Sequence, residues 1–184
     1  MEFLSVLWLP IVVSAVFVFI ASSILHMVLP IHRGDYQQLP DEDELLAAMR
    51  AHGVQRAQYM FPLPASMKDM GSPEMLEKYK RGPVGTMTIL PPGPPAIGKS
   101  LIQWFLHSLL IGVFVAYLTY HALPRDADYL AVFRIAGAAA VLGYALGYLP
   151  ESIWKGARWS TTAKFIFDGV VYALLTAGVF GWLW

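Results

Sequence analysis

The residues of this chain that could do chemistry are polar side chains within long apolar stretches: His26, Lys99, Gln103, His107, Arg134, Lys164 and Asp168. Lys99, Gln103 and His107 recur every fourth residue and therefore share one side of a helix. Lys164 and Asp168 are one helical turn apart and can form an ion pair. Because charge is costly inside a bilayer, we expect such residues to face the interior of a helix bundle.

These residues allow a functional and a structural interpretation. Asp168 and His107 could build a polar pocket or a proton path. The same side chains could instead form hydrogen bonds between helices that fix the helix register. We favour the structural interpretation, because a small bundle needs such contacts. A separate hypothesis is a small enzyme site near the inner membrane face, where His26, His32 and Asp35 are close in sequence.

Metal and cofactor chemistry has few candidates. The chain has no cysteine, which excludes thiolate metal sites and cysteine nucleophiles. His26 and His107 could bind haem as paired axial ligands, but their expected depths differ by several ångströms at ~1.5 Å per residue. Met67 and Met70 could bind Cu(I), although methionine is more often adaptable packing. We predict no metal site and no cofactor, with haem and copper as the less favoured alternatives.

Four apolar stretches must position these residues: 3–29, 97–123, 129–149 and 162–184. Each exceeds the roughly 18 residues that a helix needs to cross the hydrocarbon core. Only 14% of the residues are charged, against about 25% in soluble domains. The sequence therefore predicts an all-α protein, a four-helix transmembrane bundle with a cytoplasmic insertion between spans one and two.

The chain is expected to divide into a first span at 1–30, an extramembrane insertion at 31–96, and spans two to four at 97–184. Eleven of the thirteen Lys and Arg residues lie in the insertion, at its border with span two, or around the loop after span three. Positive charge gathers in cytoplasmic segments. Both chain ends are therefore predicted outside the cell and the insertion in the cytoplasm.

The insertion has local signals for short elements. Four acidic residues at 41–44 favour the start of a helix that reaches about residue 52. Ser72 and Pro73 are a typical cap and first residue of a second helix ending at Gly82, and residues 84–90 could form a strand. At roughly 65 residues the insertion is too small for a robust core of its own. We expect it to pack on the membrane face or on a partner.

Residues 93–100 match the phosphate-loop pattern G-x-x-x-x-G-K-[ST]. That loop binds phosphate through successive backbone N–H groups, and Pro94 and Pro95 remove two of those donors. The following helix is a membrane span, so we predict no nucleotide binding. The net charge is zero, so no overall field attracts nucleic acid, and none is expected as a partner.

Small residues recur every fourth position in the last two spans: Ala139, Gly143 and Gly147 in span three, and Gly169, Ala173 and Ala177 in span four. Such strips let helix backbones approach closely, which matters because the hydrophobic effect does not drive helices together in lipid. The pattern predicts close pairing of spans three and four, or an oligomer through one of these faces.

The chain also resembles a group of proteins over its whole length. The resemblance is carried by Ile24-Leu25-His26-Met27-Val28-Leu29-Pro30, by Leu39-Pro40-Asp41-Glu42-Asp43, and by the segment from Trp159-Ser160-Thr161-Thr162 to Trp184. These segments are similar to an uncharacterised family of small bacterial four-span membrane proteins with no assigned function. The resemblance implies a bacterial origin, and hence a multi-pass protein of the inner (plasma) membrane.

The leading functional hypothesis is a non-catalytic accessory, assembly or scaffold subunit of a membrane complex. It depends on the lack of a metal-binding sequence cluster, a nucleophile with its base, or a credible phosphate loop. The alternative is a small transporter or proton-coupled carrier that uses Asp168 and His107. A membrane enzyme or a metal- or haem-binding protein is third. Besides the lipid bilayer, the expected partner is another protein or a second copy of the chain.

Overall fold

The computed structural model describes residues 2–184 and divides the chain into two compact units. One unit combines the N-terminal segment up to Tyr36 with Ala96–Trp184, and the other is Gln37–Pro95. The second unit thus begins at Gln37, inside the insertion predicted at 31–96. The segment between the first span and Gln37 folds back onto the last helix, where Asp35 contacts Lys164.

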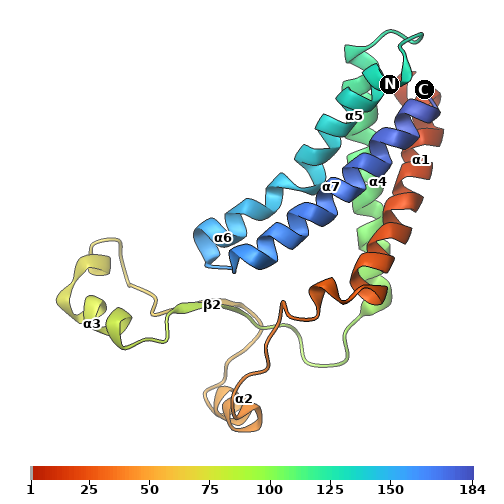
Figure 1. Cartoon of the computed structure of the whole chain (residues 1–184). Coiled ribbons are helices and arrows are strands. Elements are labelled where there is room, and N and C mark those ends of the chain that lie inside the picture. The colour runs from red at the N-terminus through yellow and green to blue at the C-terminus, as the bar shows by residue number, and fades with distance from the viewer. Residues whose placement is uncertain (1) are drawn as a thin grey trace. The chain divides into compact units, whose positions relative to one another are not determined.

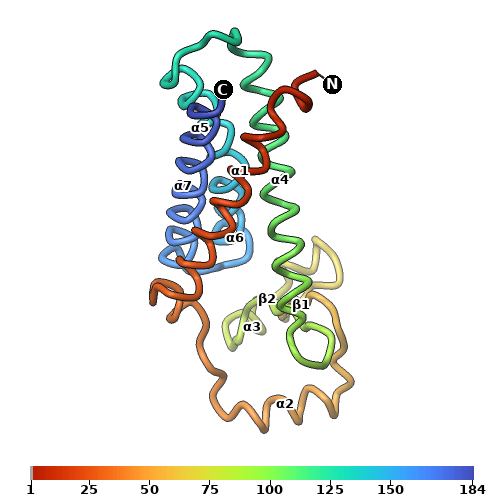
Figure 2. Tube along the Cα trace, turned by 90° about the vertical axis from the view of Figure 1, so that its right-hand side faces the viewer, coloured from red at the N-terminus to blue at the C-terminus, as the bar shows by residue number. Residues whose placement is uncertain are grey.

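The first unit is a bundle of four long helices: α1 (Glu2–Ser23), α4 (Ile97–Ala122), α5 (Tyr129–Tyr144) and α7 (Trp159–Trp182). They lie side by side in both views, and the two chain ends lie at the same end of the bundle (Figures 1 and 2). Four helical stretches are long and apolar enough to cross a membrane. The predicted all-α four-helix bundle is confirmed, and the chain is a multi-pass integral membrane protein.

The bundle exposes large apolar side chains and buries small polar ones. Phe114 is 61% exposed and Leu142 is 64% exposed, whereas Thr119 and Thr176 are fully buried. Each threonine hydroxyl donates a hydrogen bond to a carbonyl oxygen one turn earlier in its own helix. Thr119 donates to Val115 O at 2.7 Å, and Thr176 donates to Tyr172 O at 2.9 Å. This distribution is what a lipid solvent requires, because the outer surface gains nothing from being polar.

Two prolines bend the helices that contain them. Pro10 lies inside α1, and Leu7 one turn earlier leaves the helical region with φ −109° and ψ 17°. The third span was expected to end before Pro150, but the chain makes a 3₁₀ turn, η4 (Leu146–Tyr148), and continues as α6 (Leu149–Lys155). A proline ring clashes with the carbonyl of the preceding turn but fits the first turn of a new helix. The third span therefore runs over Tyr129–Lys155 with a bend in the middle.

The helices α5 and α7 approach each other closely around Gly169. A Cβ atom on Gly169 would lie 2.6 Å from the carbonyl oxygen of Tyr144, so no side chain fits there. Ala173 and Ala177 are buried on the same side of α7, and Gly137 of α5 faces Ala177. The predicted pairing of the last two spans and the predicted strip on span four are thus both present.

The strip predicted on span three does not face α7, and its alternative role in an oligomer stays a prediction. A Cβ atom on Gly143 would lie 3.1 Å from the Ile111 side chain of α4, and one on Gly147 would meet nothing within 4 Å. Ala139 is only partly buried, whereas Ala136 and Ala140 are fully buried. A shift of one residue turns a helix face by about 100°. The small residue of α5 that faces α7 is therefore Gly137, outside the predicted strip.

The second unit holds α2 (Glu42–Ala51), α3 (Pro73–Arg81) and a hairpin of β1 (Gln58–Phe61) and β2 (Gly85–Thr88), which pair antiparallel. The predicted helices and the strand within 84–90 are confirmed. Ser72 caps α3 by accepting a hydrogen bond of 3.2 Å from the Met75 amide. Within Gln37–Pro95, Met75 is the one buried residue, which agrees with the expectation that this unit has little core.

Candidate functional site

A change in helix type at the end of the first span positions His26. The α1 helix widens into a single π-helical turn, η1 (Ile24–Val28), closed by a hydrogen bond of 2.9 Å from Leu29 N to Ile24 O. The chain then turns through a short 3₁₀ segment, η2 (Pro30–His32). Such π turns are rare and often occur at functional sites. Here the turn brings His26 and His32 together, with ring centroids 4.2 Å apart.

Asp35 connects this turn to the last helix. Its carboxylate accepts a hydrogen bond of 2.6 Å from His32 Nδ1 and another of 2.6 Å from Lys164 Nζ of α7. Its side chain is 3% exposed. Burial alone would raise the pKa of the Asp35 carboxyl, but the hydrogen bonds from Lys164 and His32 outweigh burial and hold the pKa below its usual range. Asp35 is therefore a buried carboxylate that orients the imidazole of His32.

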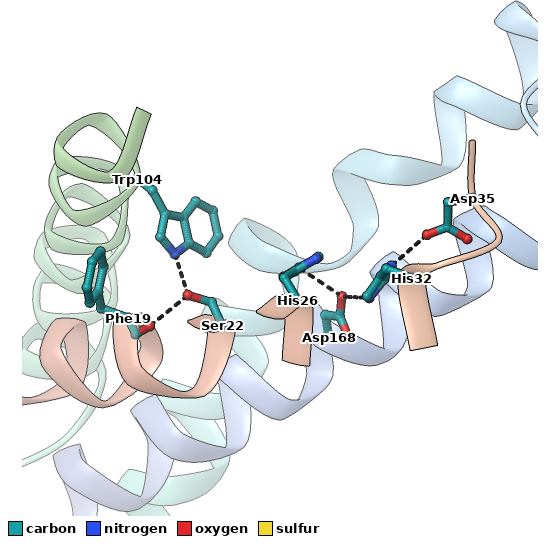
Figure 3. A network of polar contacts seen from close by, with 7 residues as sticks. All are labelled: Phe19, Ser22, His26, His32, Asp35, Trp104 and Asp168. Atoms are coloured by element: carbon teal, nitrogen blue, oxygen red, sulfur yellow. Dashed lines mark hydrogen bonds and ion pairs between the residues drawn. The ribbon is translucent and has the colours of Figure 1, made fainter. Parts of the chain in front are cut away.

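Asp168 of α7 lies on the opposite side of His32 (Figure 3). Its Oδ2 atom is 2.9 Å from His32 Nε2 and 3.4 Å from His26 Nε2. The residue is 1% exposed. The contact with His32 lacks hydrogen-bond geometry, so His32 Nε2 and both carboxylate oxygens of Asp168 are buried without a hydrogen-bond partner. Buried polar groups are nearly always satisfied, so these atoms need an explanation.

The hydrogen bond from His32 to Asp35 explains the unsatisfied atoms. A carboxylate only accepts, so the Nδ1 atom of His32 carries a proton. In a neutral ring with this tautomer, Nε2 would present a lone pair to Asp168, whose carboxylate also has only lone pairs to offer. With both histidines neutral, the two carboxylates of the cluster would be matched by one lysine, Lys164. A cation between Nε2 and Asp168 would then remove the conflict.

The ligand atoms have the spacing of a metal site. His26, His32 and Asp168 each offer one ligand atom, and these atoms lie within 4.8 Å of one another. A tetrahedral zinc site with bonds of about 2.0–2.1 Å separates neighbouring ligand atoms by about 3.3 Å. Metal-binding histidines usually donate their other ring N–H to a carboxylate, as His32 does to Asp35. The residues present therefore fit a divalent ion.

A cavity of about 320 Å³ adjoins this cluster. Asp168 and His26 line it, together with side chains from five elements: Ser22, Ser23, Met27, Leu101, Trp104, Tyr148, Phe165 and Tyr172. Trp104 is held in place by a hydrogen bond of 2.8 Å from its Nε1 to Ser22 Oγ. The Tyr172 hydroxyl is buried and has no partner. The cavity thus has an apolar body and a polar end at Asp168.

Several predicted site residues lie elsewhere. Lys99, Gln103 and His107 are exposed on α4, and Arg134 is exposed on α5. His107 contacts Trp104 and Tyr144 rather than Asp168 or His26. Among the described contacts, none joins His107 to Asp168 or to His26, the partners proposed for it in the polar pocket and in the haem pair.

The expected ion pair between Lys164 and Asp168 is also replaced. Lys164 extends to Asp35 instead, while Asp168 turns to the two histidines. The reason is that the folded-back segment after the first span supplies a carboxylate and two imidazoles at this depth of the bundle. The grouping of His26, His32 and Asp35 suggested by the sequence does form, and the structure adds Lys164 and Asp168 to it.

Sequence reasoning missed the metal-ligand set because its members are distant along the chain. His26 and His32 are six residues apart, which is not a helical repeat, and only the π turn and Pro30 bring them together. Asp168 joins them from the last helix. An aspartate within an apolar span indicated a site at this position, but the spacing of residues in the sequence did not predict which side chains contact it.

Comparison with known proteins assigns no function to this cluster. No protein family, curated protein or solved structure matches the chain. The resemblance to small bacterial membrane proteins stays a prediction, and the function has to be argued from the cluster itself.

Proposed function

We propose that this protein binds a divalent transition-metal ion through His26, His32 and Asp168 in the membrane, and that the ion serves chemistry at the adjoining cavity. The observation that carries the proposal is a set of three potential ligand atoms within 4.8 Å of one another, two of them buried without a hydrogen-bond partner. A cation at their meeting point would satisfy all three. Two imidazoles and a carboxylate suit Zn²⁺ and its neighbours better than Mg²⁺ or Ca²⁺.

The number of ligands favours a reactive site over a purely structural one. Structural zinc sites are closed by four protein ligands, whereas catalytic sites have three and keep one position open. Here three protein ligands are present, and two of them, His26 and Asp168, line the cavity. An ion with an open position can polarise a carbonyl or phosphoryl oxygen, or lower the pKa of a bound water. A metal-dependent membrane enzyme is therefore the function that the site supports best.

Metal binding by the purified full-length chain tests this proposal. We expect equilibrium dialysis of the protein in detergent to give one Zn²⁺ or Co²⁺ per chain. Asp168→Asn keeps the size of the side chain but removes its charge, and should abolish tight binding. His107→Gln is the matched control, because His107 is exposed on α4 outside the cluster. Metal binding that is unchanged in Asp168→Asn and in His32→Gln would refute the proposal.

A partner protein is a second proposal, because the unit Gln37–Pro95 has exposed apolar side chains and almost no core. Met67 is 81% exposed and Leu90 is 72% exposed in this unit. These residues support the accessory or scaffold role predicted from the sequence. Gentle native purification followed by mass spectrometry would test it, with a stoichiometric second protein as the expected result. Recovery of the chain alone, as a single copy, would count against it.

The cellular setting belongs to the same proposal. The distribution of Lys and Arg favours a plasma membrane with both chain ends outside, and the family resemblance favours a bacterial inner membrane. His26 lies at the end of the first span, His32 follows it before the unit Gln37–Pro95, and Asp168 lies in the first half of α7. With this orientation the cluster would lie near the cytoplasmic face.

A further inference from the structure

We infer that the cavity beside the cluster binds a membrane amphiphile, with its apolar tail among α1, α4 and α7 and an anionic oxygen head group at the open position of the metal. This inference rests on the proposed metal site and names the class of ligand for it. It follows from the lining of the cavity, from the unsatisfied groups at its polar end, and from where its mouth opens.

The body of the cavity suits a hydrocarbon segment. Its volume of about 320 Å³ is near the lower limit of ligand sites, which span roughly 300–1,000 Å³. The apolar part of its lining includes Met27, Leu101, Trp104 and Phe165. A site of this size and lining accepts a head group and the first carbons of a chain, and the rest of the chain must extend outwards.

The polar end needs oxygen atoms from a ligand. Tyr172 is 4% exposed, lines the cavity, and its hydroxyl has no hydrogen-bond partner. A buried hydroxyl without a partner is costly, and a ligand oxygen can accept its hydrogen. His26 and Asp168 face the same space. A head group with two oxygens can therefore contact the ion and the Tyr172 hydroxyl together.

The mouth of the cavity points to lipid as the source of the ligand. Met27 is 76% exposed and Leu101 is 40% exposed, and both belong to membrane-spanning helices. An entrance bordered by exposed apolar side chains within a span is reached from the bilayer. A small soluble anion would lack contacts with most of the lining, so an amphiphile fits better.

A pair of metal-binding probes with the same head and different tails tests the inference. The full-length protein in detergent is loaded with Co²⁺, and its visible absorption bands are followed during titration with octanohydroxamate or acetohydroxamate. Both probes bind metal ions through two oxygens. We expect octanohydroxamate to perturb the bands at a concentration at least about tenfold lower, because only its tail buries apolar surface in the cavity.

Variants distinguish binding of the longer probe in the cavity from its partitioning into the detergent micelle. Leu101→Trp should fill the cavity and remove the preference for the longer probe while the Co²⁺ bands remain. Leu106→Trp is the control, because Leu106 is 56% exposed on the same helix and is not part of the lining. Met27→Trp, at the exposed mouth, provides a second test that does not depend on the bundle tolerating a large side chain at Leu101.

The outcomes distinguish this inference from the proposed function. Equal affinity for the two probes in Co²⁺-loaded wild-type protein would overturn the inference and leave the metal site standing. If both Leu101→Trp and Met27→Trp still prefer octanohydroxamate, the preference comes from the detergent micelle. That result would also overturn the inference. Failure of wild-type protein to bind Co²⁺ would refute the metal site and, with it, the ligand proposed for that site.

Discussion

Lys164 of α7 donates a hydrogen bond of 2.6 Å to Asp35, a residue 129 positions earlier in the chain. The same carboxylate accepts a hydrogen bond from His32. Lys164 therefore fixes the carboxylate of Asp35, which in turn orients the imidazole of His32. Neither Lys164 nor Asp35 contributes one of the three grouped ligand atoms.

We expect Asp35→Asn to weaken binding of Zn²⁺ by about 10–100-fold without removing a ligand, because partners of this kind fix the tautomer and direction of a metal-binding histidine. Competition with a chromophoric chelator would measure the change. Glu151→Gln is the control, because it breaks an exposed ion pair with Lys155 outside the cluster. Equal affinity in the two variants would show that Asp35 does not orient His32.

The close approach at Gly169 predicts that alanine substitutions at Gly169 and at Gly147 differ sharply in their effect on thermal stability. Gly169→Ala places a methyl group 2.6 Å from the Tyr144 carbonyl oxygen, so the α5 and α7 backbones must separate. We expect a clear loss of thermal stability in detergent, because helix pairing in lipid depends on such contacts. Gly147→Ala adds the same methyl group where nothing lies within 4 Å, and should change the melting temperature little. Similar melting temperatures for both variants would contradict the packing.

The orientation predicted from Lys and Arg can be tested with single cysteines, since the chain has none of its own. Ser66→Cys, in the unit Gln37–Pro95, should be protected from an impermeant thiol reagent in intact cells and react after lysis. Asp126→Cys, between α4 and α5, should react in intact cells. The reverse pattern would invert the topology.

The phosphate-loop pattern at residues 93–100 should not bind nucleotide. The helix α4 begins at Ile97, so the first part of the motif is irregular chain in which Pro94 and Pro95 offer no N–H group. We expect isothermal titration with ATP and GTP to show no binding. Saturable binding that disappears in Lys99→Ala would contradict this expectation.

The elements of the fold were largely predictable because each has a local cause. Long apolar runs have to be helices in a membrane, and the cap at Ser72 with Pro73 sets the start of α3. The strand β1 was missed because its four residues Gln58–Phe61 gain their structure only from pairing with β2. The bend in the third span was also missed, since Pro150 can end one helix or begin another.

The candidate site was predictable only in part, because its members meet through tertiary structure. The low tolerance of lipid for charge marked Asp168 and Lys164 as important. Their partners depend on the path of the chain after the π turn, which no repeat in the sequence indicates. His107 has the same residue type as His26, but its position on α4 places it beside Trp104 and Tyr144 instead of Asp168.

The fold-back of the segment up to Tyr36 onto α7 also bears on how the protein is made. The histidines and Asp35 precede Lys164 and Asp168 along the chain, so they are synthesised earlier. Until α7 is in place, the bundle lacks the carboxylate that faces His26 and His32. A span carrying Asp168 is in turn costly to place in lipid alone. We therefore expect the earlier span, through these contacts, to lower the cost of inserting α7 into the membrane.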